Sequence, residues 1–140
     1  MAGSKSDYLE KAILDYLLGG GALAKPATVY VALSTATYSD ASTGASMSEV
    51  AGNAYARVAV SNDATQWPAA SGTSPAQKQN GQAITFPAAT GAWGTVTSFY
   101  ICDAASAGNV LYGGDLSVAK AIASGDTATF AANSITITED

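Results

Sequence analysis

The sequence predicts a mainly β protein: an antiparallel β-sandwich, of jelly-roll or Greek-key type, with one short N-terminal α-helix. About seven or eight short runs rich in β-branched and aromatic residues are separated by Gly, Pro, Asn, Asp and Ser turns. One segment near the N-terminus instead has apolar residues at helical spacing. With 140 residues, the chain is long enough for one domain and too short for two.

Asp7 is expected to be the N-cap of the helix, because Asp7 and Glu10 have the spacing of a capping box. Gly19–Gly21 should end it. The residues expected on its core-facing side are Leu9, Ile13 and Tyr16 or Leu17. Leu14 and Leu18 widen this apolar stripe. The helix therefore either caps one end of the β domain or docks on a neighbouring subunit or another protein.

A β-hairpin is expected at the centre of the fold. Its strands are Thr95–Cys102 and Asn109–Tyr112, and Gly113-Gly114 should end the return strand. Trp93, between glycines, should anchor the hairpin. Further strands are expected at 26–33, 55–60, 83–86, 116–122, 127–130 and 135–138. Two long polar stretches, 35–53 and 61–82, are expected to be loops.

Three residues outside the helix are candidates for binding. Arg57, the one arginine, forms either a salt bridge or cation–π contact at the rim or a fork to an acid of another subunit. Trp67 is either tucked under the loop 61–82, the favoured reading, or displayed as a binding anchor. Tyr38 would join Trp67 in a binding site built from the two long loops.

Catalysis is not expected. The chain has no histidine, and it lacks the CxxC, HExxH, P-loop and Ser–His–Asp patterns. Cys102, the single cysteine, should be a buried strand residue. We therefore expect no cofactor and no metal, and read the acids Asp40 and Glu49 as solvated loop residues. The net charge of −5 argues against nucleic-acid binding, and no apolar run approaches membrane-spanning length.

A set of segments, taken in order and spacing, resembles a known family. They are SDYLEKAILDYLL, KPATVYVALSTA, EVAGNAYARVAV, FPAATGAWGTVTSFYICDAASAGNVLYGGDL and SGDTATFAANSITIT. The chain resembles the small virion proteins of tailed phages called phage tail fibre proteins, over nearly its whole length apart from Ala64–Gln82. The resemblance implies a part of the phage particle without saying which part.

We therefore expect a non-enzymatic structural protein of the virion. Charged residues make up only 12% of the chain, which suits a surface covered by copies of itself or by capsid or tail proteins. A trimer that decorates or cements the capsid is the preferred interpretation, because a chain without repeats cannot form a fibre shaft alone. The alternative is a tail-fibre or tail-tip module that binds a host receptor, such as a glycan.

Overall fold

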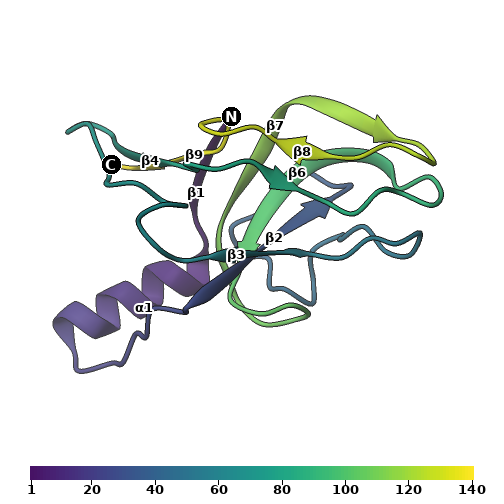
Figure 1. Ribbon diagram of the computed structural model, residues 1–140. Coiled ribbons are helices and arrows are strands. Elements are labelled where there is room, and N and C mark those ends of the chain that lie inside the picture. The colour runs from purple at the N-terminus through teal and green to yellow at the C-terminus, as the bar shows by residue number, and fades with distance from the viewer.

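The computed structural model describes residues 1–140 and confirms a mainly β protein with one short helix (Figure 1). A curled seven-stranded sheet has the order β3-β2-β6-β7-β1-β9-β4, and β5 and β8 form a second sheet. The elements are β1 Ala2–Lys5, α1 Asp7–Leu18, β2 Thr28–Ser34, β3 Val58–Ser61, β4 Ala76–Gln79, β5 Ile84–Thr85, β6 Gly94–Cys102, β7 Val110–Ile122, β8 Thr129–Phe130 and β9 Thr136–Glu139.

The main core lies between the two sheets. Ile84 and Phe130 of the small sheet belong to the same buried cluster as Val31 and Phe99 of the large sheet. Phe99 and Phe130 meet edge to face with ring centroids 5.9 Å apart. A register shift in β6 near Thr97 changes the alternation of its side chains, which places Val96 in this cluster too.

The N-terminal segment forms a strand that the sequence analysis missed. β1 pairs antiparallel with β7 and parallel with β9, the one parallel pair in the structure. Its residues are small and polar, so it has no apolar alternation to reveal it. A Cβ on Gly3 would lie 2.8 Å from the carbonyl oxygen of Gly113, so this close approach of the two strands requires glycine.

The central hairpin exists, but its return strand is longer than predicted. β7 runs for 13 residues through Gly113-Gly114, where the sequence analysis placed a break. A Cβ on Gly113 would lie 2.4 Å from the ring of Tyr38, and one on Gly114 would lie 2.4 Å from the carbonyl oxygen of Ala2. These glycines therefore make room for neighbours inside a strand. Trp93 is buried as predicted, and its indole donates to the carbonyl oxygen of Asn53 at 3.0 Å.

Two other local predictions are corrected. Residues 76–79, placed in a long loop, form β4, which is held by pairing with β9 despite its polar sequence. The N-cap of α1 is Ser6, whose hydroxyl accepts from the Leu9 amide at 3.2 Å, and Asp7 is the first helical residue. Ser6 is fully buried, so this cap fixes the helix to the sheet at its first turn.

Only the first turns of α1 pack against the β-sheet. Leu9 is its one buried residue, so the expected core contacts of Tyr16 and Leu17 are not made. Figure 1 shows α1 extending away from the sheet, with its C-terminal end at the periphery. No helix in the structure has the length and apolar character needed to cross a membrane.

Candidate functional site

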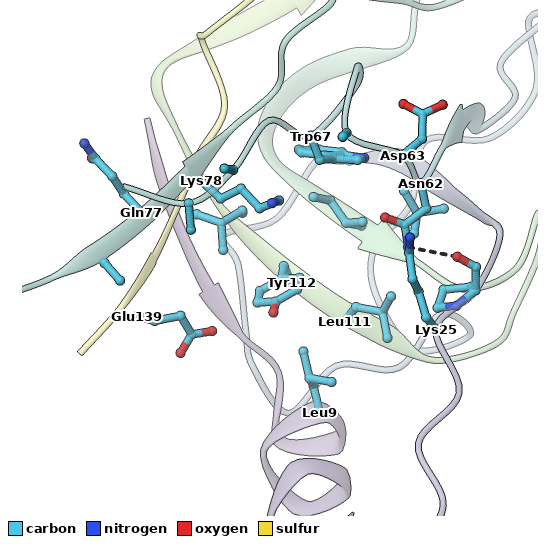
Figure 2. A pocket seen from close by; sticks show the side chains of 18 of the residues that line it. Leu9, Lys25, Asn62, Asp63, Trp67, Gln77, Lys78, Leu111, Tyr112 and Glu139 are labelled. Atoms are coloured by element: carbon cyan, nitrogen blue, oxygen red, sulfur yellow. Dashed lines mark hydrogen bonds between the residues drawn. The ribbon is translucent and has the colours of Figure 1, made fainter. Parts of the chain in front are cut away.

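An apolar groove of about 700 Å³ opens between the start of α1, the connector that follows the helix, and the loop that leads to β4 (Figure 2). Its volume falls within the roughly 300–1,000 Å³ of protein ligand sites. The lining residues are Leu9, Leu23, Ala24, Lys25, Pro26, Val29, Asn62, Asp63, Ala64, Trp67, Ala69, Ala70, Ala76, Gln77, Lys78, Ile101, Leu111, Tyr112, Ile137 and Glu139.

The floor of the groove is formed by side chains of the sheet. Val29, Ile101 and Ile137 come from β2, β6 and β9 and belong to the main core. Tyr112 of β7 is half-buried, and burial raises the pKa of its hydroxyl. Core side chains therefore continue into an open depression, which is the usual basis of a hydrophobic binding site.

Two asparagines hold the loop that forms the upper wall. The Asn62 side chain donates to the carbonyl oxygen of Pro26 at 2.8 Å, which ties the loop to the connector after α1 (Figure 2). Asn80, fully buried, donates to the carbonyl oxygens of Gln82 and Ala131 and accepts from the Ile135 amide. Because these three hydrogen bonds use both the amide N–H groups and the oxygen of the Asn80 side chain, the wall is held in place before anything binds.

Trp67 forms part of this wall and is not displayed on the surface. Its side chain is 8% exposed, consistent with the tucked reading. Its indole N–H is buried without a hydrogen-bond partner, whereas the comparable N–H of Trp93 has one. A buried donor without a partner costs about 1–3 kcal/mol. The groove wall therefore holds one of the two buried side-chain polar groups that have no partner, the other being the Thr97 hydroxyl of β6.

The rim carries two lysines without an acidic partner. Lys25 and Lys78 form no salt bridge, whereas Glu139 is paired with Lys5. Asp63 accepts at 2.9 Å from the amides of Thr65 and Gln66 and so caps its own turn. The two free ammonium groups make the rim slightly positive on a protein whose net charge is −5.

Arg57 lies in a different part of the molecule and is fully used within the chain. Its side chain is 2% exposed and grips Glu49 through Nε and Nη2, both at 2.8 Å. Its remaining hydrogens go to the carbonyl oxygens of Gly44, Ala104 and Ala107. All five donors of the guanidinium thus have acceptors. We call this arrangement the Arg57 clamp.

The Arg57 clamp joins the loop 35–53 to the turn between β6 and β7. The hydrogen bond to Glu49 is the main cause that raises the pKa of the Arg57 guanidinium. Tyr55 completes the arrangement: its hydroxyl donates to Glu49 at 2.8 Å and accepts from the Leu33 amide at 3.0 Å. The fork to an acid therefore exists, but it lies within one chain, so Arg57 is not free to reach another subunit. Nor is Glu49 a solvated loop acid, as the sequence analysis expected.

Tyr38 also faces inward. Its ring contacts Tyr100 with centroids 5.2 Å apart, and its hydroxyl lies within hydrogen-bond distance of the carbonyl oxygens of Ser4 and Lys5. Burial raises the pKa of the Tyr38 hydroxyl to about 12. Tyr38 and Trp67 therefore lie in separate environments and do not form the shared receptor surface that the sequence analysis considered.

The two helical candidates, by contrast, are open to solvent. Leu14 is 59% exposed and Leu18 is 82% exposed, and Leu17 between them is 68% exposed. We call Leu14, Leu17 and Leu18 the α1 patch. Of the five predicted binding residues, these two leucines alone are available to a partner through their side chains.

The groove itself was not predicted. Its residues come from the helix, the connector, one long loop and several strands, so no local pattern marks it. The signal in the sequence that points to it is the pair of alanine-rich, uncharged runs at 22–24 and 64–70. No group of three or more His, Cys, Asp or Glu residues is placed to hold a metal ion.

Comparison with known proteins identifies the family. The model of the family described as podophage GP4 fiber I protein gp80 matches residues 4–138. The chain therefore belongs to this family of phage fibre proteins, which implies an association with the virion. The search of curated proteins finds no match.

Proposed function

We propose that the protein is a structural subunit of a fibre on a tailed-phage particle and that it acts by binding other protein chains through the apolar groove. The observation that carries this proposal is the groove. Its floor consists of buried core side chains, and the apolar residues around that floor, such as Leu23, Leu111 and Tyr112, are only half-buried in a single chain. Covering them removes apolar surface from water, which is the main driving force of protein association.

The rest of the surface supports the same proposal. Only 12% of the residues are charged, and the exposed large apolar side chains gather on the helix, with Val118 as the exception. A lone soluble subunit rarely leaves such features uncovered. Self-association, which the sequence analysis expected as a trimer, is therefore part of the proposal.

A fibre position is preferred over capsid decoration because the family description names a fibre protein. Decoration of the capsid, the first preference of the sequence analysis, remains a prediction of the same class of function. Receptor binding is less favoured, because Trp67 is buried and Tyr38 is half-buried with its ring against Tyr100.

Locating the protein in the particle tests this proposal. Antibody labelling of phage particles in the electron microscope should place the protein on fibres. Quantitative mass spectrometry should count far fewer copies than capsid subunits. Labelling spread over the capsid, with a copy number in the hundreds, would favour decoration instead. Absence from purified particles would contradict both.

A further inference from the structure

The α1 patch lies on the solvent side of the helix, opposite its contact with the sheet. Successive residues of a helix are rotated by about 100°, so Leu14, Leu17 and Leu18 gather on one side while Leu9 faces the other. Exposure agrees with this geometry, because all three are more than half exposed and Leu9 is buried. Glu10 lies on the same side as the patch, one turn before Leu14.

The helix cannot bring this patch into its own groove. Its first turn is fixed by the buried Ser6 cap, and the Ser6 hydroxyl also donates to the carbonyl oxygen of Val110. At its other end, the amides of Gly20 and Gly21 both donate to the carbonyl oxygen of Asp15, which keeps the last turn helical. A single chain therefore leaves both the groove and the patch uncovered.

The charges of the two surfaces are complementary. α1 carries Asp7, Glu10 and Asp15 against Lys11, three acids and one base, for a net charge of −2. The groove rim carries Lys25 and Lys78 against Asp63, for a net charge of +1, since Lys5 and Glu139 neutralise each other. An acidic helix that presents leucines fits an apolar groove flanked by free lysines.

We propose that the groove of each copy takes the α1 patch of a second copy of this chain, an inference that rests on the proposed function. Every copy has one patch and one groove, so copies alone can cover both in equal number. The patch lies on the helix that also contributes Leu9 to the groove wall. Two copies exchanging helices, or three in a ring, would satisfy every patch and every groove.

Sedimentation of the purified full-length protein tests this inference. We expect the wild-type protein to be a dimer or trimer. We expect the double variant Leu14→Ser/Leu18→Ser to weaken association at least tenfold, because it removes apolar contacts from the proposed interface. Val118→Ser is the matched control: Val118 is 70% exposed but lies outside the groove and the helix, so association should not change.

The groove side is tested by charge. Lys25→Glu/Lys78→Glu should also weaken association. Adding Glu10→Lys should restore part of it, since opposite charges then face each other again between the helix of one copy and the groove of the other. Circular dichroism confirms that each variant is folded. A wild-type protein that stays monomeric at every accessible concentration would overturn the inference. So would association that both double variants leave unchanged.

This result is independent of the particle experiment. A monomer found on fibres would contradict the exchange of helices and leave the fibre location standing. An oligomer absent from particles would contradict the fibre location and leave the exchange standing.

Discussion

The Arg57 clamp and the apolar groove are two regions of one domain that treat their polar groups in opposite ways. At the clamp, a guanidinium that is 2% exposed has an acceptor for every hydrogen. At the groove, half-buried apolar side chains such as Leu23 and Leu111 line an open depression. Two rim lysines there have no ion pair, and the indole N–H of Trp67 has no hydrogen-bond partner. The two regions share no residue.

The difference separates what the chain needs to fold from what it offers to a partner. A region whose groups are all satisfied within the chain gains nothing from a second molecule. A region that leaves apolar surface and charge unpaired gains from being covered. Substitutions at the clamp should therefore change the stability of the single chain, and substitutions at the groove and patch should change association.

The largest effect is expected at the clamp. Arg57→Ala leaves three loop carbonyls without their Arg57 donor and leaves the Glu49 carboxylate with the Tyr55 hydroxyl but no positive charge beside it. The free energy of unfolding should therefore fall by about 3–5 kcal/mol. Arg57→Lys is the control, because it keeps the positive charge but cannot form the two-pronged contact with Glu49. Its free energy of unfolding should lie between those of wild type and Arg57→Ala. Denaturant titration measures both. An Arg57→Ala protein as stable as wild type would contradict the clamp's structural role.

Alkaline pH should lower the free energy of unfolding through Cys102, which lies near Arg57 and Glu49 of the clamp. Burial raises the pKa of the Cys102 thiol from its ordinary value of 9.0 to about 11. The unfolded chain thus loses this proton first, so the thiol's contribution to stability is complete below pH 9 and is lost as pH rises toward 11. The free energy of unfolding should fall by on the order of 2 kcal/mol over that interval.

Cys102→Ala isolates the thiol from the tyrosines, whose raised pKa values act in the same direction. Its stability should decline less steeply between pH 9 and pH 11 than that of wild type. Identical slopes for the two proteins would show that the thiol is not the group responsible.

Two tryptophans allow a direct comparison of a satisfied and an unsatisfied donor. Trp67→Phe removes an indole N–H that has no partner, so its cost should stay below about 1.5 kcal/mol. Trp93→Phe removes a hydrogen bond to the Asn53 carbonyl, which keeps the Thr90 amide as a donor, and should cost about 0.5–1.5 kcal/mol in addition to its lost area. Equal losses of unfolding free energy in the two variants would mean that the groove wall is as well satisfied as the core.

The smallest effect on the single chain is expected at the α1 patch. Leu14 and Leu18 contact little of their own chain, so Leu14→Ser/Leu18→Ser should change the free energy of unfolding by only about 0.5 kcal/mol when measured on dilute, dissociated protein. A large loss under these conditions would show that the leucines serve the fold instead of a partner.

Local pattern was enough to predict the helix, most strands and the buried positions of Trp93 and Cys102. It failed for β1 and β4, because their small and polar residues are held as strands by pairing with β7 and β9. It also misplaced the end of the hairpin, since Gly113-Gly114 serves close approach instead of a turn. Arg57 was singled out as a candidate for binding, whereas its side chain holds the fold together. Its intrachain partners lie on loops whose meeting no spacing reveals.

The same limit explains the site. Leu14 and Leu18 could be proposed because a helix fixes its own geometry, and both are exposed. The groove could not be predicted, because segments from residue 9 to residue 139 meet there only after folding.

Disulfide cross-linking between copies tests most directly whether one chain covers the groove of another. Leu18→Cys protein would be mixed with Ala70→Cys protein under mild oxidation, while the native Cys102 stays buried and does not compete. If the helix of one copy enters the groove of the next, the mixture forms a linked pair of the two variants, and a Val118→Cys and Ala70→Cys mixture does not. Equal, slow cross-linking in both mixtures would contradict the claim that the helix of one copy enters the groove of another.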